Sequence, residues 1–334
     1  MTVSDLSEQE LVGRIKARLA PSPTWMLVGI GDDAAVVEPV RNLVDVLTVD
    51  SIVEGVHFDR RDTPPQAIGH RALAVNLSDL AAMGAMPRLI LLSFALPPDL
   101  PCDDFDGIVD GLVGLAAVHH THVAGGNLTR SPGPLVIDVT AVGSVKRRQV
   151  LKRTGAKPGD GVYVTGAVGG ARAGLQVLRA QSGESSHYEP CVERYRYPQA
   201  RVRAGVLLAR NRAATACMDL SDGLADGIRQ IAEASGIGAA IERAAIPVEP
   251  TARAWFESCG ADPVIEALRG GDDYELVFTA PPKQRGRLRA VLRHGGVAIT
   301  RIGTCTKEST IQLIGSAEDQ TTGAALPLGF SHFR

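Results

Sequence analysis

Two successive series of strand-like and helical segments, separated by a turn-rich stretch, limit the folds open to this chain more than any other feature of its sequence. Residues 146–161 contain Gly155, Pro158 and Gly159, which interrupt the apolar pattern on either side. A chain of 334 residues is also longer than one hydrophobic core commonly serves. We therefore predict an α/β (α+β) protein of two lobes, residues 1–150 and residues 151–334.

The spacing of apolar residues predicts the elements of each lobe. Ser7 and Glu10 form a capping box at the start of an amphipathic helix, and a second helix follows Pro64 and ends at Gly84. The H-H-x-H cluster at 119–122 favours a loop and strand edge over a metal site. Strands are also predicted at 44–49, 89–96, 135–145, 162–164, around 216 and at 275–279. Further helices are predicted at 103–117, after the glycines at 166–170 as far as residue 180, and beginning at residue 201, with a polar loop at 182–198.

The charge balance argues against nucleic acid and against a membrane as partners. Thirty-five Lys and Arg face 37 Asp and Glu, so the chain has no broad positive field. The longest apolar run, residues 89–96, is too short to cross a bilayer. Residues 1–10 lack the features of a secretory signal, so a cytoplasmic location is expected. The five cysteines are scattered and form no C-x-x-C pair, which indicates ordinary core or surface residues.

Acidic residues recur in turns along the chain. One such turn is unremarkable, because Asp and Gly are common turn residues. The set as a whole is less ordinary: Asp50 is expected to end a strand, Asp79 lies in an otherwise apolar helix, and Asp219 follows an apolar run. Magnesium prefers oxygen ligands and is held by one or two carboxylates together with substrate phosphates. The acidic turns therefore favour a magnesium–nucleotide site.

Several common catalytic motifs are missing from the sequence. It contains no G-x-x-x-x-G-K-[ST] loop, no H-R-D with D-F-G and no G-x-S-x-G elbow. Gly166, Gly169 and Gly170 lie between a strand and a helix, where they could cradle a phosphate or simply allow tight packing. Of these two interpretations, tight packing is favoured.

Six motifs rich in Asp and Gly are spread over almost the whole chain. They are Gly-Ile-Gly-Asp-Asp-Ala at 29–34, Thr-Val-Asp-Ser at 48–51 with Gly-Val-His-Phe at 55–58, Ala-Val-Asn-Leu-Ser-Asp-Leu-Ala-Ala-Met-Gly-Ala at 74–85, Arg-Thr-Gly-Ala-Lys-Pro-Gly-Asp at 153–160, Met-Asp-Leu-Ser-Asp-Gly-Leu at 218–224 and Gly-Gly-Asp-Asp-Tyr-Glu-Leu at 270–276. In type and order they resemble the thiamine-monophosphate kinase family, within the aminoimidazole-ribonucleotide-synthetase-like superfamily.

The resemblance implies a two-lobed aminoimidazole-ribonucleotide-synthetase-like fold and a homodimer that pairs through N-terminal strands. It also implies phosphorylation of thiamine monophosphate to thiamine diphosphate, with ATP as co-substrate and Mg²⁺ as cofactor. Direct in-line transfer is expected, because a phosphate monoester with a second pKa of about 6 is already deprotonated enough to attack.

The resemblance also assigns roles to individual residues. The implied magnesium ligands are Asp33, Thr48, Val49 through its backbone, Asp50, Asp79, Asn127, Asp219 and Asp222, with Asp50, Asp79, Asp219 and Asp222 central to catalysis. The implied ATP contacts are Gly126, Asn127, Arg153 and Ser221, and the implied thiamine monophosphate contacts are His57, Asp272 and Phe330. Asn127 stands where the family commonly has Asp, and Asp272 where some members have Glu.

Two alternative interpretations remain at this point. Another ATP-using member of the superfamily, such as selenophosphate synthetase, the cyclo-ligase or the hydrogenase-maturation dehydratase, would share several motifs. The first cysteine is Cys102 and the chain ends in His332-Phe333-Arg334, so the terminal cysteines expected of the selenium enzyme and the dehydratase are not found. A non-catalytic nucleotide or thiamine-phosphate binding protein would retain substrate contacts but lose metal ligands. The five acidic clusters, at 32–33, 50, 79, 219–222 and 272–273, argue against this alternative.

Overall fold

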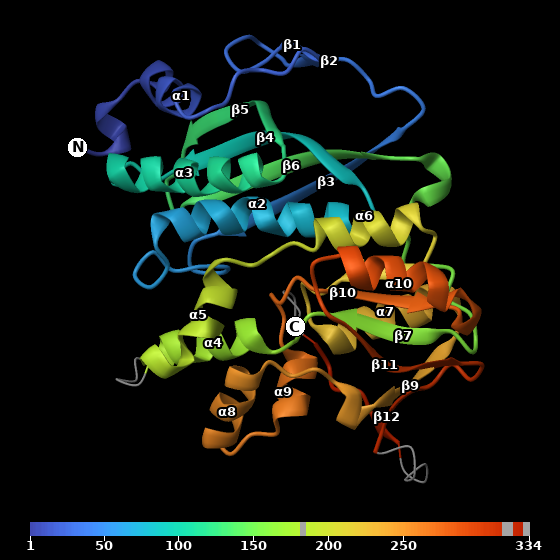
Figure 1. Cartoon of the computed structure of the whole chain (residues 1–334). Coiled ribbons are helices and arrows are strands. Elements are labelled where there is room, and N and C mark those ends of the chain that lie inside the picture. Colours follow the sequence, from blue (N-terminus) through green and yellow to red (C-terminus); the bar gives the residue numbers. More distant parts are fainter. Residues whose placement is uncertain (181–184, 316–322, 330–334) are drawn as a thin grey trace. The chain divides into compact units, whose positions relative to one another are not determined.

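The computed structural model describes residues 1–180, 185–315 and 323–329, and these form two compact units (Figure 1). The first unit comprises Met1–Leu80 and Met86–Arg147, and the second comprises Ala81–Ala85 and Arg148–Arg334. Both mix helices with strands, which confirms the expected α/β class. Among the described residues, no helix is long and apolar enough to cross a membrane.

A four-stranded sheet forms the centre of the first unit, in the order β3 (Val44–Val53), β6 (Val136–Val145), β4 (Met86–Leu96) and β5 (His122–Arg130). Its strands pair antiparallel except for β4 and β5, which are parallel. Side chains alternate along β3: Leu47 and Val49 are exposed, whereas Thr48 and Asp50 are half-buried on the other face. This alternation gives the sheet an open face and a covered face.

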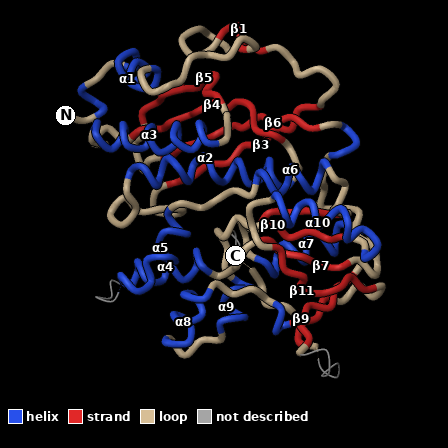
Figure 2. The backbone as a smooth tube through the Cα atoms, in the orientation of Figure 1, coloured by secondary structure: helices blue, strands red, loops and turns tan. Residues whose placement is uncertain are grey.

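Helices α2 (Pro65–Ala82) and α3 (Cys102–Val118) lie along the sheet of the first unit (Figures 1 and 2). They approach each other closely at two glycines. A Cβ added to Gly69 would lie 1.8 Å from the carbonyl oxygen of Ile108, and one added to Gly111 would lie 1.9 Å from that of Gln66. Only glycine fits at these crossing points.

The edge of the first unit is completed by α1 (Glu8–Lys16), the short η1 helix (Val3–Asp5) and a two-stranded ribbon of β1 (Met26–Val28) and β2 (Val36–Val37). The predicted capping box is present, because Ser7 Oγ accepts from the Glu10 N–H while Glu10 accepts from the Ser7 N–H. Three ion pairs join α1 and the turn after it to α3: Arg14 with Asp106, and Arg18 with both Asp106 and Asp110. The ribbon packs over Leu89 on the open face of the sheet.

The second unit is built on a seven-stranded sheet, in which β9 and β12 pair parallel and the other neighbours antiparallel. The strand order is β13 (Ala324–Ala325), β12 (Ile311–Ile314), β9 (Gly238–Glu242), β11 (Ile299–Thr306), β7 (Gly161–Thr165), β10 (Leu276–Ala280) and β8 (Ala216–Asp219). Strands β7 and β10 and the edge strand β8 are buried along almost their whole length, in keeping with their mainly apolar sequences.

The helices of the second unit are α4 (Gly170–Ala180), α5 (Glu189–Arg196), α6 (Val202–Arg210), α7 (Leu224–Ser235), α8 (Pro250–Ser258), α9 (Pro263–Arg269) and α10 (Arg285–His294), with the short helices η2 (Arg147–Gln149), η3 (Ser185–Tyr188), η4 (Arg243–Ala245) and η5 (Pro282–Gln284).

The predicted polar loop at 182–198 is wrong for its described part. Cys191, Val192 and Tyr195 share one face of α5 and are buried, and α5 lies beside α4 (Figure 1).

The last turn of α2 belongs with the second unit, where it packs against α6. A Cβ on Gly205 of α6 would lie 2.0 Å from the carbonyl oxygen of Ala81, and one on Gly84 would lie 2.4 Å from the Cβ of Ala209. Gly84 also has a φ of 69°, which suits the end of a helix.

The structure confirms most of the predicted elements and extends two of the predicted strands: the strand at 89–96 begins at Met86, and the strand at 44–49 ends later than predicted. The predicted strand at 44–49 continues to Val53, so Asp50 lies within β3 and not at its end. The polar pair Asp50-Ser51 has the composition of a turn, but Ser51, Ile52 and Val53 still pair with residues of β6. The histidine cluster lies where α3 ends and β5 begins, as expected.

Candidate functional site

Two of the predicted magnesium ligands are in contact in the first unit, and a third lies on the same face of the sheet. Thr48 and Asp50 are two residues apart on β3 and therefore share its covered face. The hydroxyl of Thr48 donates a short hydrogen bond to Asp79 Oδ2 on α2. Val49 points to the open face, so only its backbone could serve the group on the covered face.

Asp33 and Asn127 are placed elsewhere in the first unit. Asp33 lies in an exposed turn just before β2, where its N–H donates to Asp32 Oδ1 at 2.9 Å. Asn127 of β5 lies beside Ser93 of β4, and Ser93 lies beside Asp138 of β6. Asp138 in turn lies beside Ser51 of β3 and accepts a hydrogen bond from it. This register puts Asn127 on the open face of the sheet, opposite Thr48 and Asp50.

Gly126 precedes Asn127 on β5, and its identity follows from its neighbours. A Cβ at this position would lie 1.9 Å from the carbonyl oxygen of Leu92 on β4. The register of β4 and β5 shifts between Ile90 and Leu91, so the two backbones approach unusually closely just beyond the irregularity. Gly126 is therefore required by packing, whatever else its exposed backbone contacts.

His57 lies in the loop between β3 and α2, which folds back on itself. Its Nδ1 accepts a hydrogen bond from the Val53 N–H at 3.0 Å. An accepting Nδ1 carries no proton, so the proton of the neutral ring is on Nε2. His57 is thereby prepared to donate from Nε2 to an anionic group.

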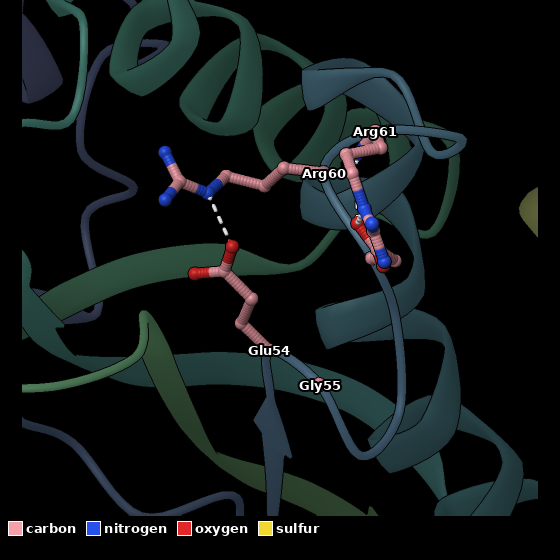
Figure 3. Close-up of a pocket in the computed structure, with 5 residues that line it drawn as sticks. Glu54, Gly55, Arg60 and Arg61 are labelled. Atoms are coloured by element: carbon pink, nitrogen blue, oxygen red, sulfur yellow. Dashed lines mark hydrogen bonds and ion pairs between the residues drawn. The ribbon is translucent and has the colours of Figure 1, made fainter.

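An ion pair fixes the same loop (Figure 3). Arg60 Nε donates to Glu54 Oε1 at 2.7 Å, and Glu54 Oε2 accepts from the Leu135 N–H at 3.1 Å. A cavity of about 410 Å³ is lined by Glu54, Gly55, Asp59, Arg60 and Arg61. The loop that carries His57 thus lines a cavity with two acidic and two basic side chains.

In the second unit, two acidic loops are joined by backbone hydrogen bonds. The N–H of Asp272 donates to the carbonyl of Ser221 at 2.8 Å, and the N–H of Tyr274 donates to that of Leu220 at 3.1 Å. A Cβ on Gly271 would lie 2.5 Å from the carbonyl oxygen of Ser221, so this contact requires glycine. The loops at 219–224 and 270–275 therefore form one surface that carries Asp219, Ser221, Asp222 and Asp272.

Asp219 and Asp222 differ in exposure within this surface. Asp219 is the last residue of β8 and is buried, whereas Asp222 and Ser221 are half-exposed. Leu276 of β10 pairs directly with Asp219, so the position of this carboxylate is set by the sheet. A carboxylate at the end of a buried strand is well placed to meet a cation.

Arg153 is exposed and is held over α7. Its Nη1 donates to Gln230 Oε1 at 2.6 Å, and Gln230 in turn donates to Asp226. Ser235 accepts from the backbone N–H groups of Gly155 and Ala156, which fixes the turn that follows Arg153. The guanidinium is therefore positioned by neighbours and is accessible to an anion. Phe330 lies outside the described residues.

One of the glycines at 166–170, Gly169, binds a protein carboxylate together with Ala171. Gly169 and Ala171, at the start of α4, donate their N–H groups to Asp273 at 2.6 and 3.2 Å. Asp273 is buried, and burial raises its pKa to about 7, although these two N–H groups oppose the shift. The start of α4 thus contacts an internal acid, which agrees with the packing interpretation of these glycines.

Glu275 is a second buried acid that sequence reasoning gave no role. It accepts from Thr165 Oγ1 at 2.7 Å and from Arg194 and Arg201. Burial alone would lower the pKa of Arg201, but its hydrogen bonds to Glu275 and the charge of Glu275 raise it. Tyr274 between them is buried as well, so no alternation in the sequence marked Asp273 and Glu275 as interior residues.

The oxygen donors fit magnesium better than a closed metal cage. Among the described residues, no three His, Cys, Asp or Glu side chains converge as a metal-binding group. Magnesium needs only one or two carboxylates when phosphates and water supply its other ligands. The group of Thr48, Asp50 and Asp79 offers this type of incomplete oxygen shell.

Comparison with known proteins identifies the family. Residues 31–145 match the model of the AIR synthase related protein N-terminal domain, and residues 157–316 match that of the C-terminal domain. A thiamine-monophosphate kinase of Synechococcus elongatus is 38% identical over 342 residues, covering 99% of this chain and 98% of that protein. The chain belongs to the thiamine-monophosphate kinase family. The family and the kinase expected from the sequence are thereby confirmed.

Solved structures of the thiamine-monophosphate kinase family share the fold. A thiamine-monophosphate kinase from Stenotrophomonas maltophilia K279a has 37% identity and a TM-score of 0.83, covering 93% of this chain and 98% of its own. AaThiL complexed with AMPPCP and TMP has 31% identity and a TM-score of 0.76, covering 100% and 99% respectively. The two-lobed fold expected from the motifs is thus confirmed.

Proposed function

We propose that the protein transfers the γ-phosphoryl group of ATP to thiamine monophosphate and releases thiamine diphosphate and ADP. The observation that carries this proposal is the match, over the whole chain, to a relative complexed with an ATP analogue and TMP. The paired acidic loops and the group of Thr48, Asp50 and Asp79 supply the oxygen donors that such a reaction needs.

Each unit would contribute its own residues to binding. In the first unit, Thr48, Asp50 and Asp79 would hold Mg²⁺, and Asp219 and Asp222 would do so in the second. The bound ion would neutralise phosphate charge and align the phosphates. Arg153 would pair with phosphate oxygens of ATP, and Ser221 would contact the same nucleotide. Asp33, Gly126 and Asn127 keep their assigned roles as predictions.

His57 and Asp272 would bind thiamine monophosphate. The Nε2–H of His57 would donate to the substrate phosphate, because Nδ1 is already engaged by Val53. The carboxylate of Asp272 would face the cationic thiazolium ring, where opposite charge favours binding. Phe330, which lies outside the described residues, is proposed as a further contact to the same substrate.

The transfer itself would be direct. An oxygen of the thiamine monophosphate phosphate attacks the γ-phosphorus while the bond to the β,γ-bridging oxygen breaks, and ADP leaves with that electron pair. No residue has to remove a proton, because the attacking phosphate is largely dianionic near neutral pH, with a second pKa of about 6. The residues of the chain act by position and charge.

An assay with purified protein, ATP, Mg²⁺ and thiamine monophosphate tests the proposal. Thiamine diphosphate and ADP should form in equal amounts, and chelation of Mg²⁺ should stop the reaction. Release of inorganic phosphate without thiamine diphosphate would contradict the proposed acceptor. Isotopic label placed in the γ-phosphate should appear in thiamine diphosphate and at no point on the protein.

A further inference from the structure

Two residues near the proposed substrate contact have an unusual backbone conformation. Asp272 has a φ of 66° and Tyr274 a φ of 49°, so both lie in the left-handed region on either side of Asp273. Asp tolerates this region moderately well, whereas a bulky residue such as Tyr rarely adopts it. Such conformations persist only where the surrounding structure fixes them. The contacts of this segment therefore need an explanation.

Asp273 fixes the segment from inside the second unit. Its two carboxylate oxygens accept from Gly169 at 2.6 Å and from Ala171 at 3.2 Å. Ala171 belongs to the first turn of α4 and Gly169 directly precedes the helix, at an end where backbone N–H groups have no partner within the helix. Asp273 thus ties the middle of the strained segment to the end of a helix.

Glu275, two residues after Asp273, holds the 270–275 segment at a second point. Arg201 binds it with two hydrogen bonds, Nε to Oε2 at 2.7 Å and Nη2 to Oε1 at 2.5 Å, and Arg194 adds a third at 3.1 Å. A Cβ on Gly166 would lie 2.0 Å from Glu275 Oε1, so this position has to be glycine. The Glu275 side chain is completely buried.

Asp272 points the other way and is the one acid of the three that is half-exposed. Its Oδ1 accepts from the hydroxyl of Tyr274 at 3.1 Å, and its N–H donates to the Ser221 carbonyl. Tyr274 is itself buried, so its hydroxyl is a fixed donor. The orientation of the Asp272 carboxylate therefore depends on residues that contact it from the interior.

We propose that Asp273 and Glu275, with Arg201 and Tyr274, are positioning residues that hold the Asp272 carboxylate in the orientation that binds thiamine monophosphate. This rests on the proposed function, in which Asp272 contacts that substrate. Since a misplacement of about 1 Å can cost about 100-fold in rate, a small relaxation of the segment has a measurable effect. ATP, which is assigned to other residues, should be affected little.

Steady-state kinetics of three variants and one control variant tests the proposal. Asp273→Asn keeps the shape but loses one acceptor, Arg201→Lys loses the paired hydrogen bonds of the guanidinium, and Tyr274→Phe loses only the hydroxyl. Each should raise KM for thiamine monophosphate by about 10-fold or more, with KM for ATP changed by less than about twofold. The matched control is Asp160→Asn.

Asp160 is a suitable control because it is another buried acid of the second unit. It accepts from the Lys157 N–H at 3.0 Å and from Thr215 Oγ1 at 2.7 Å, and it lies outside the 270–275 segment. Asp160→Asn should lower the melting temperature without separating the two KM values. Equal rises in both KM values for Asp273→Asn, or the same separation in Asp160→Asn, would overturn the proposal.

Two further results keep this inference distinct from the proposed function. Asp272→Asn retains a residue that tolerates the left-handed region and removes only the charge. If it leaves KM for thiamine monophosphate unchanged in an active enzyme, the substrate role of Asp272 is wrong. If Asp273→Asn does not fold, unchanged KM values in both Tyr274→Phe and Arg201→Lys would overturn the positioning role alone.

Discussion

The hydrogen bond between Thr48 and Asp79 joins two side chains to which the proposed function assigns magnesium. We expect Asp79→Asn and Asp50→Asn to lower kcat by about 100-fold or more, because each variant removes a full charge from the metal ligands. Added Mg²⁺ should restore part of the activity. Folding should be retained, since both side chains are only half-buried. Turnover at several Mg²⁺ concentrations, with melting curves in chelator, measures both effects.

The matched control is Asp103→Asn, an exposed acid in the first turn of α3. It should leave kcat within about twofold of the unchanged protein, because a single exposed charge at a helix start contributes only about 0.3–1 kcal/mol. Near-normal activity of Asp79→Asn without extra Mg²⁺ would remove Asp79 from the metal site.

Asp273 should make stability depend on pH. Burial raises its pKa to about 7 in the folded protein, whereas an Asp in the unfolded chain titrates near 3.9. Between these values the folded state keeps a proton that the unfolded state has lost, so this residue makes stability fall as pH rises from about 4 to about 7. Below and above that window its effect is constant.

Denaturant unfolding of the unchanged protein and of Asp273→Asn, at pH 4.5 and pH 7.5, measures this effect. The difference in unfolding free energy between the two proteins should change by a few kcal/mol across the window, since one pKa unit corresponds to about 1.4 kcal/mol. A pH-independent difference for Asp273→Asn would mean that Asp273 is already ionised at the lower pH.

The residues of the candidate site were predictable to different degrees. Asp50, Asp79 and Asp219 stood out because they are acids within apolar segments, and the structure places Thr48 and Asp79 in contact. Asp273 and Glu275 were missed, because their partners Gly169 and Arg201 are remote in sequence. When the hydrogen-bond partner of an acidic residue is remote in sequence, the local sequence does not show whether that residue faces the interior or the solvent.

At the scale of the helices, the crossing of α2 and α3 depends on glycine at Gly111. Gly111→Ala should destabilise the protein by about 1–3 kcal/mol, because the added Cβ would lie 1.9 Å from the Gln66 carbonyl and the helices would have to separate. Gly114→Ala, one turn later in α3, meets no atom within 4 Å and should stabilise by about 0.4–1 kcal/mol.

Thermal and denaturant unfolding of these two variants gives opposite shifts if α2 and α3 cross as described. Both substitutions add the same methyl group and the same helix propensity, so the difference between them isolates the contact between helices. Two stabilised variants would show that Gly111 is not at a close crossing.

Helices and strands with a regular apolar pattern were predicted well. Strands that are recognisable only by their pairing with strands remote in sequence were not. The helix at 102–118 and the long strands of the first unit follow from local periodicity. The helix at 65–82 is buried on nearly all sides, and its prediction follows from its apolar length between Pro64 and Gly84. The short strand β9 consists mainly of Gly and Ala, and its neighbours β11 and β12 are about 60 residues away or more. Such a strand becomes recognisable only once its partners are in place.

On the scale of the whole molecule, the open face of the four-stranded sheet is the place where we expect two copies to pair. Leu47 and Val49 are 69% and 61% exposed, and Leu91, across from Val49 through Thr140, is 39% exposed. Adjoining exposed apolar side chains of this type mark interaction surfaces. We therefore propose that the homodimer expected from the family forms here.

Sedimentation velocity of Leu47→Asp tests this expectation. The unchanged protein should sediment as a dimer and Leu47→Asp as a monomer, because a charge in an apolar interface loses its hydration without gaining a partner. Val118→Asp is the matched control: Val118 is 71% exposed at the end of α3 and away from the sheet face. A dimer in both variants would place the interface elsewhere.

The division of α2 between the two units has a consequence for how this chain can be taken apart. A single cut after Arg147 would separate most of the two units but would leave Ala81–Ala85 on the wrong fragment. Gly205 and Ala209 of α6 would then lose the backbone against which they pack. The second fragment would therefore lack part of its own packing, so the chain cannot be divided at this point into two independent modules.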